Sequence, residues 1–205
     1  MDELRSPDLR INPLTLESSA QMTSAMQNFA VSRELGLIVL DDANDSNPYC
    51  LITEGPAQGM VVHFSHDLEP EIRFPGLSAF GQSLRAAVAN ELDIDDLPHS
   101  PLPSFADQTT LTEYLESHLR RDDEDSQFLV CLLLPLLDPR QLAVIDAAAT
   151  SNNFFIRERV AEFIAANPLK QHSQAAERLS NDPYRQVSRS GKKALSSVNR
   201  VEFGG

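Results

Sequence analysis

Apolar residues in the first 92 positions follow first a helical and then a strand-like spacing. Between Thr15 and Glu34 they recur every three or four positions, which predicts an amphipathic helix capped by Ser18 or Ser19 and ended by Gly36. A second helix is predicted from Leu77 to Leu92. Between these helices lie three short apolar runs separated by turn-forming residues, at 37–40, 49–53 and 60–64, and 71–74 is a candidate for a fourth, short edge strand. Such runs predict an antiparallel meander.

The remaining chain is predicted to be helical. Residues 93–103 (DIDDLPHSPLP) hold three acids and three prolines and are typical of a linker. Helical spacing resumes at Leu111, where Thr109 or Thr110 is the expected cap. Further helices are expected over the apolar run 128–137, from Asp138-Pro139 onward, and over 174–179. Residues 153–166 also align with 184–197 at an offset of 31, which is typical of a helical repeat.

These patterns predict an α+β protein with two domains. The first, residues 1–95, is expected to be an antiparallel sheet flanked by helices. The second, residues 104–205, is expected to be an all-α helical repeat region.

Charge divides the chain at a different point. Residues 1–126 carry 23 acidic and 7 basic side chains, whereas residues 127–205 carry 7 acidic and 10 basic ones, and the whole chain has a net charge of −13. An acidic surface repels nucleic acid and anionic membranes and attracts basic proteins. We therefore expect no direct nucleic-acid contact and no membrane contact.

The cysteines and the N-terminus predict a soluble, reduced, cytoplasmic protein. Cys50 and Cys131 lie far apart in apolar runs, so each is expected to be a buried free thiol. The N-terminal sequence MDELRSPDLR lacks the apolar stretch of a signal peptide. The longest apolar run, 128–137, contains Pro135 and is too short to span a bilayer.

No residue pattern indicates catalysis, a metal or a cofactor. His63 and His66 precede Asp67, but residues three apart on a strand point to opposite faces, which disfavours a shared metal. The sequence contains neither a G-x-S-x-G elbow nor a phosphate-binding glycine loop. The adjacent pair Asp95-Asp96 is interpreted as solvated linker charge. We therefore predict that the protein is not an enzyme.

Acidic residues cluster in the turns of the predicted meander. Alternate turns of a meander lie at the same end of the sheet, so the first and third turns are expected to share one rim, with Glu54 at the other end. Their acidic residues are Asp41, Asp42, Asp45, Asp67, Glu69 and Glu71. Two interpretations of this acidic rim are open: it keeps the protein soluble, or it binds a basic partner.

The strand and helix motifs of the first domain resemble the SMI1/KNR4, or SUKH, superfamily. They are GLIVLDDANDSNPYCLI (36–52), GMVVHFSHD (59–67) and LSAFGQSLRAAV (77–88). The resemblance implies an α+β fold without catalytic residues. It also implies that the chain is an immunity protein, since many bacterial members of this superfamily neutralise a toxin, often a nuclease. The family's tryptophan is absent from this chain.

The second domain resembles HEAT-like repeats over Asp182-Pro183-Tyr184-Arg185, Val187 and Ala194-Leu195. Ser188 and Gly191 stand where that repeat prefers Arg and Ala.

Together these observations predict an immunity protein whose six acidic rim residues bind a basic nuclease toxin and occlude its active site. The alternative is a non-enzymatic adaptor that binds a protein through the C-terminal helices. For the basic residues there, docking against the acidic half or plain solvation is favoured over nucleic-acid binding: Arg178, Arg185, Arg189, Lys192, Lys193 and Arg200.

Overall fold

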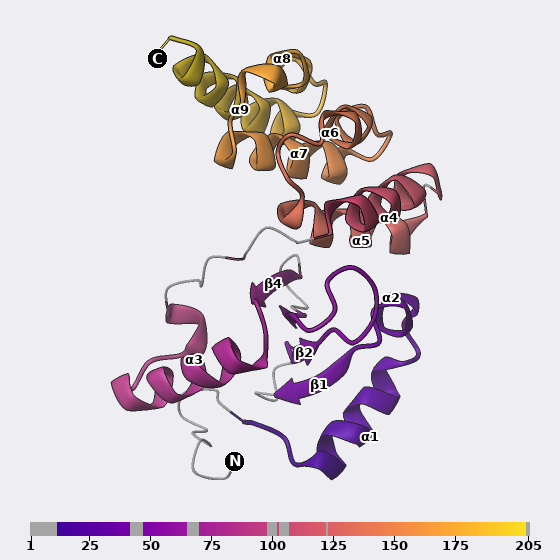
Figure 1. Ribbon diagram of the computed structural model, residues 1–205, viewed down its shortest axis with the longest axis vertical. Coiled ribbons are helices and arrows are strands. Elements are labelled where there is room, and N and C mark those ends of the chain that lie inside the picture. Colours follow the sequence, from indigo (N-terminus) through magenta and orange to yellow (C-terminus); the bar gives the residue numbers. More distant parts are fainter. Residues whose placement is uncertain are drawn as a thin grey trace. The chain divides into compact units, whose positions relative to one another are not determined.

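A computed structural model describes residues 12–41, 47–64, 70–97, 102, 107–121 and 123–203, with side chains up to residue 201. The chain is α+β and forms two compact units, Met1–Pro103 and Ser104–Gly205 (Figure 1). Each unit has its own core and is considered separately.

The sheet of the first unit is an antiparallel meander, as predicted from the apolar runs. Its strands pair in chain order: β1 (Ile38–Asp41), β2 (Tyr49–Leu51), β3 (Val61–His63) and β4 (Glu71–Phe74). β2 and β3 are shorter than their apolar runs, β1 lies one residue later than its run, and β4 has the expected bounds. Register shifts occur within β1, between Val39 and Asp41, and in the β3–β4 pair, between Val61 and Val62. Such bulges bend a strand and increase its twist.

The predicted helix over 15–34 is two helices, α1 (Leu16–Met26) and α2 (Ala30–Glu34). The expected caps Ser18 and Ser19 are wrong, because Thr15 caps α1 by accepting a hydrogen bond from the Ser18 N–H at 3.2 Å. The predicted stop at Gly36 is correct, since this residue has a φ of 56°. Glycine reaches that left-handed region at no steric cost.

Helix α1 closes the open edge of the sheet through its hydroxyl groups. The Val39 N–H donates to Thr23 Oγ1 at 3.0 Å, and Ser19 Oγ donates to the Val39 carbonyl. The two hydroxyls lie four residues apart, on one face of the helix. They satisfy backbone groups of β1 that a second chain would otherwise pair with.

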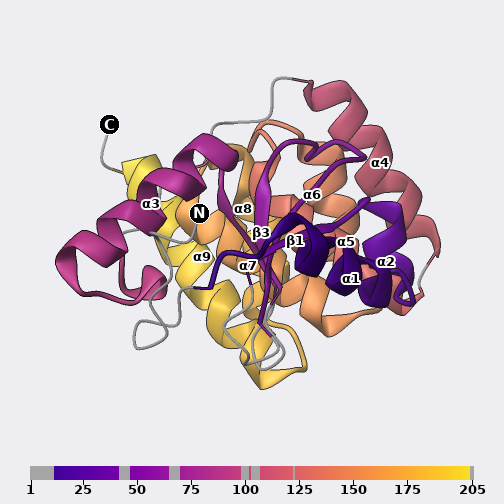
Figure 2. The ribbon, with the colours of Figure 1, turned by 90° about the horizontal axis from the view of Figure 1, so that it is seen from below.

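Helix α3 (Leu77–Asn90) lies on the opposite side of the sheet from α1 (Figure 1, Figure 2). It ends within two residues of its predicted end. Phe80, Leu84 and Ala87 of α3 pack on Tyr49, Val61 and Phe74 of the sheet and on Ile94, which lies in the 3₁₀ turn η3 (Ile94–Asp96). The first unit therefore extends into the predicted linker.

In the part of the second unit that the structure describes, all regular elements are helices or 3₁₀ turns, joined by short loops. Its elements are α4 (Gln108–Arg121), α5 (Glu124–Leu133), η4 (Leu134–Leu136), α6 (Leu142–Ala149), α7 (Phe154–Ala166), η5 (Lys170–His172), α8 (Ser173–Ser180) and α9 (Arg185–Phe203). The apolar run 128–137 is thus two elements. Pro135 lies inside η4, and it prevents α5 from continuing as an α-helix because proline lacks an N–H and its ring clashes with a helical carbonyl four residues earlier.

Two expected helix starts of the second unit are wrong. Asp107, and not Thr109 or Thr110, caps α4 by accepting from the Thr110 N–H at 3.0 Å. The Asp138-Pro139 pair does not open a helix: Asp138 accepts from the Arg140 N–H at 2.9 Å, and α6 begins at Leu142. Aspartate is a strong acceptor in both caps and turns, so the sequence alone does not separate the two uses.

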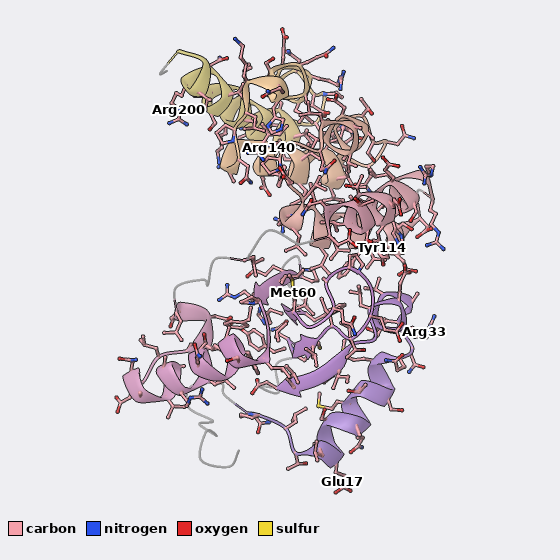
Figure 3. The ribbon with its side chains drawn as sticks, in the orientation of Figure 1. Glu17, Arg33, Met60, Tyr114, Arg140 and Arg200 are labelled. Atoms are coloured by element: carbon pink, nitrogen blue, oxygen red, sulfur yellow. The ribbon has the colours of Figure 1, made fainter. Side chains whose placement is uncertain are left out.

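Buried polar side chains join α4 to α5. His118 is 3% exposed, and its Nδ1 lies 3.0 Å from the Ser126 hydroxyl. The ring of Tyr114 on α4, labelled in Figure 3, lies against that of His118, with centroids 4.4 Å apart. Asp123 caps α5 by accepting from the Ser126 N–H at 2.8 Å, and this hydrogen bond is the main cause that lowers the pKa of Asp123.

Close backbone packing joins α8 to α9 at Gly191. A Cβ atom at this position would lie 2.3 Å from the carbonyl carbon of Leu179, well inside van der Waals contact. Val187, Ala194 and Val198 are completely buried on the same side of α9. Only glycine allows the two helices to approach this closely.

An ion pair links the start of α7 to the turn before α9. Arg157 contacts Asp182 through two nitrogens, at 2.6 and 3.2 Å, and the two side chains are 12% and 7% exposed. Burial alone raises the pKa of Asp182 and is the largest single influence. The hydrogen bonds from Arg157 and the Tyr184 N–H, together with the guanidinium charge, outweigh it and leave the pKa lowered.

Gly191→Ala tests the contact between α8 and α9. We expect a loss of about 2 kcal/mol or more in the free energy of unfolding, because backbone atoms must move to admit the methyl group. Gly81→Ala in α3 is the matched control, since its Cβ meets only Arg85 Nη1 at 3.8 Å. That change should stabilise the protein by roughly 0.5–1 kcal/mol. Equal effects in urea unfolding would contradict the packing described.

Asp182→Asn tests the buried ion pair. Because the pKa of Asp182 is lowered in the folded protein, its ionised carboxylate stabilises the fold at pH values above the pKa of an unfolded aspartate, about 3.9. This stabilisation is lost as the pH falls through the pKa of Asp182 in the folded protein. We expect Asp182→Asn to cost about 2 kcal/mol in urea unfolding at pH 7 and much less near pH 3. Glu177→Gln on the exposed face of α8 should cost nothing measurable. A cost independent of pH would show that the charge is unimportant.

Candidate partner-binding site

Strand register brings two connections of the meander to one end of the sheet. Asp41 pairs with Tyr49, Tyr49 with His63, and His63 with Glu71, so the four residues form one row across the strands. The β1–β2 and β3–β4 connections both leave from this row, which we call the rim. The β2–β3 connection, with exposed Glu54, lies at the opposite end.

The structure places two of the six predicted contact residues. Asp42, Asp45, Asp67 and Glu69 lie outside the described residues. Asp41 is 3% exposed, and its carboxylate accepts a hydrogen bond from the Asn12 N–H at 2.8 Å. This carboxylate holds the N-terminal segment against β1 and does not face solvent.

Glu71 does reach the surface, where it is paired with a buried arginine. Its side chain is 40% exposed, and Oε1 lies 2.8 Å from Nη1 of Arg73. Arg73 itself is 6% exposed. A guanidinium that is buried to this extent needs carboxylate partners, because an unpaired buried charge is strongly destabilising.

Asp95 is the second carboxylate at Arg73. Its Oδ1 lies 3.6 Å from Arg73 Nη2, and its backbone carbonyl accepts from the same nitrogen at 3.5 Å. The Tyr49 hydroxyl also donates to Asp95 Oδ1. The interpretation of Asp95 as solvated linker charge is therefore wrong. The neighbouring apolar residues Ile94 and Leu97, which pack against the core, are the signal in the sequence that this segment is held in place.

Tyr49 and His63 form the floor of this cluster. Their rings stack with centroids 4.5 Å apart, and His63 Nδ1 lies 3.9 Å from Asp95 Oδ1. Burial, and then the hydrogen bond and charge of Asp95, raise the pKa of Tyr49 far above its ordinary value. The phenol is therefore a neutral donor at physiological pH.

Cys50 follows Tyr49 and is completely buried. Burial raises the pKa of its thiol to about 12, so the reactive thiolate is scarcely populated at neutral pH.

This arrangement presents fixed hydrogen-bond acceptors. The carboxylates of Glu71 and Asp95 are 40% and 49% exposed, and both are held from beneath by Arg73. A partner's basic side chain would meet acceptors already in place, which reduces the conformational entropy lost on binding.

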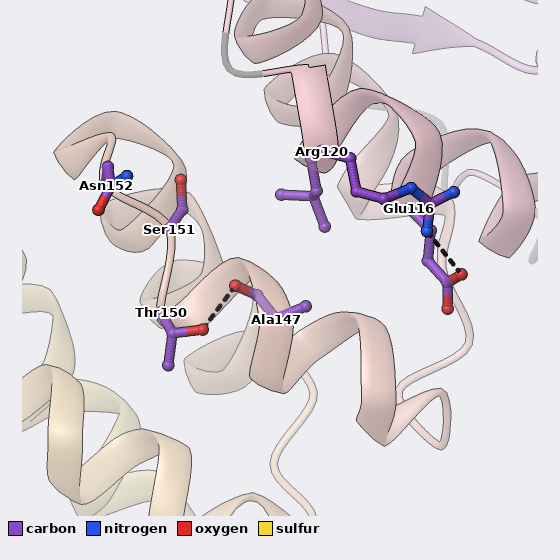
Figure 4. Close-up of a pocket in the computed structure, with 7 residues that line it drawn as sticks. Glu116, Arg120, Ala147, Thr150, Ser151 and Asn152 are labelled. Atoms are coloured by element: carbon purple, nitrogen blue, oxygen red, sulfur yellow. Dashed lines mark hydrogen bonds and ion pairs between the residues drawn. The ribbon is translucent and has the colours of Figure 1, made fainter.

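A separate hollow of about 630 Å³ lies within the second unit, lined by residues of α4 and by the end of α6 with the turn after it (Figure 4). Its charged residues pair with each other, since Arg120 Nη1 lies 3.6 Å from Glu116 Oε2. The Thr150 hydroxyl donates to the Ala147 carbonyl at 2.9 Å. These groups are already engaged within the protein, so we do not assign the hollow a ligand.

Within the described ranges, no three His, Cys, Asp or Glu side chains are grouped so that they could hold a metal ion. In the same part of the chain, none of the helices has the length and apolar character needed to cross a bilayer.

Comparisons with known proteins identify no relative. No family model matches the chain, and neither a curated protein nor a solved structure is significantly similar to it. Functional inference therefore depends on the residues described above.

Tyr49→Phe tests the cluster that Tyr49 and His63 form with Arg73 and its carboxylate partners Glu71 and Asp95. We expect it to lower the free energy of unfolding at pH 7 by about 1 kcal/mol, the usual contribution of one hydrogen bond. Because the folded pKa of Tyr49 is raised, its stabilisation is complete below pH 10 and is lost as pH rises beyond the unfolded value of about 10.

Tyr49 of the wild type should therefore ionise only as the protein unfolds in alkali, as followed by tyrosinate absorbance. Tyr49→Phe should remove this late signal, and Tyr184→Phe, at a half-exposed position, should retain it. Persistence of the late signal in Tyr49→Phe would contradict the assignment.

Proposed function

We propose that this chain is an immunity protein of the SMI1/KNR4 type, which binds and neutralises a cognate bacterial toxin in the cytoplasm. The main support is the strand register, because the strands that flank the β1–β2 and β3–β4 connections end at the rim that holds Glu71. In the sequence these connections carry Asp42, Asp45, Asp67 and Glu69. Asp95 adds a further carboxylate beside Glu71, through their shared partner Arg73.

Such a rim suits a basic partner, and we propose a nuclease. A nuclease binds the phosphate backbone with basic residues, and carboxylates at fixed positions would occupy those residues in place of phosphate. In this proposal the chain acts by covering the toxin's active site and does no chemistry itself. Steering between opposite charges would speed association and weaken as salt screens it.

The proposal treats the second unit as a HEAT-like helical region that follows the SUKH-like domain. The two segments aligned in sequence lie in α7 and α9, and these helices pack on each other. In this view the second unit supports the toxin-binding unit.

One observation favours the alternative adaptor function. Phe155 and Tyr184 are 48% and 51% exposed, and both lie against Phe154, which stacks on Tyr184 with centroids 5.0 Å apart. Exposed aromatic groups of this kind are common anchors in protein interfaces. An adaptor would bind its partner here rather than at the rim.

The test uses the purified product of the adjacent reading frame as the probe. We expect the neighbouring frame's product to inhibit growth when it is expressed alone. Co-expression of the full chain should neutralise that product, and the two purified proteins should bind each other less tightly as salt increases. A quadruple change of Asp42, Asp45, Asp67 and Glu69 to Lys should abolish binding and protection. The matched control, Glu17→Lys with Glu54→Lys, changes exposed acids away from the rim and should retain both activities.

Undiminished protection by the quadruple variant would overturn the rim assignment. Loss of binding in Phe155→Ser with Tyr184→Ser, with the rim variant unaffected, would instead establish the adaptor. Circular dichroism and urea unfolding of every variant separate lost binding from lost folding.

A further inference from the structure

Helix α9 carries a row of cations on its outer face. Five basic residues are exposed there: Arg185, Arg189, Lys192, Lys193 and Arg200. At 100° per residue they lie within an arc of about 100°, and the row is about 22 Å long. The buried residues Val187, Ala194 and Val198 occupy the other side of the helix, so the fold fixes the cations toward solvent.

These cations are not neutralised by the described part of the chain. None of the five has a carboxylate of a described residue within 4.0 Å, whereas Arg73, Arg120, Arg157 and Arg159 all do. Arg200, labelled in Figure 3, instead bonds its own helix, with Nη2 3.1 Å from the Ser197 hydroxyl.

The surface beside the row is grooved. Two adjoining hollows of about 480 and 500 Å³ share Lys192, Ser196 and Arg200 in their walls. Lys193, Ser197 and the apolar Ala165 complete the second hollow, and Asn199 and the apolar Leu195 complete the first. Lys, Arg, Ser and Asn are the side chains that most often contact phosphate oxygens.

We propose that the outer face of α9 binds the sugar–phosphate backbone of nucleic acid without sequence preference. Between Arg185 and Arg200 the exposed residues other than the cations are polar, namely Gln186, Ser196 and Asn199. A stable protein interface needs apolar anchors among its charges, whereas the exposed apolar residues here, Tyr184 and Val201, lie beyond the two ends of the row. A membrane-surface helix would need a free apolar face, but that face of α9 is buried in the fold.

The net charge of −13 does not prevent this contact. That charge predicts no nucleic-acid binding, but α9 carries no acidic residue between Arg185 and Arg200. The acid bonded to this stretch from α7 is Glu158, whose Oε2 accepts from Gln186 Nε2 at 3.2 Å. Within this unit α4 and α5 lie at one end and α9 at the other (Figure 1). Salt screens charges beyond about 8 Å at physiological ionic strength, so α9 acts on phosphates largely through its own cations.

The test measures binding of a fluorescein-labelled 20-base-pair duplex of random sequence to the full chain by anisotropy. With five phosphate contacts, the logarithm of the association constant should fall with the logarithm of salt at a slope near −4.5, which is about a 500-fold loss between 50 and 200 mM. Arg189→Gln with Lys192→Gln should bring the slope to about −2.7. The control, Arg85→Gln with Arg140→Gln, also removes two exposed cations and should leave it unchanged.

Three results would overturn the proposal: no binding at 50 mM salt, an equal loss in the two double variants, or competition by poly-L-glutamate as effective as by unlabelled duplex. The last would assign the face to acidic protein instead. The inference is independent of the proposed immunity function, because the α9 variant should protect against toxin as well as the wild type does.

Discussion

The buried guanidinium of Arg73 is the interaction on which the first unit's candidate site depends. A charge at 6% exposure must be compensated, and its partners come from two places: Glu71 on the same strand and Asp95 in η3. The need to satisfy Arg73 therefore holds the segment after α3 against the sheet. It also fixes two carboxylates at the rim, where a flexible linker would have left one of them free in solvent.

The regular parts of this fold follow from local spacing, and its irregular parts do not. Three apolar runs with turn residues between them, and the candidate edge strand after them, define the meander, because each strand needs only its own alternation and its neighbours in the chain. Helix α3 is predictable for the same reason. Pro135 is visible in the sequence, but whether proline bends or ends a buried helix depends on what surrounds it.

The candidate site shows the same limit more sharply. The common end of the two acidic connections follows from meander topology, and the sequence was sufficient to predict it. The burial of Asp41 and of Arg73 was not predictable, because each depends on a group far away in the chain: Asn12 lies 29 residues from Asp41, and Asp95 lies 22 residues from Arg73. Charge patterning alone counts such residues as surface.

Helix α1 is attached to its sheet in an unusual way, by hydroxyl contacts and with no fully buried side chain. Such contacts give little cooperativity with the core, so α1 belongs to the part of the molecule that opens most easily while the rest stays folded. Each opening uncovers the backbone of β1. An opening of this helix alone therefore leaves the Val39 N–H and carbonyl without their hydroxyl partners, in a domain that is otherwise folded.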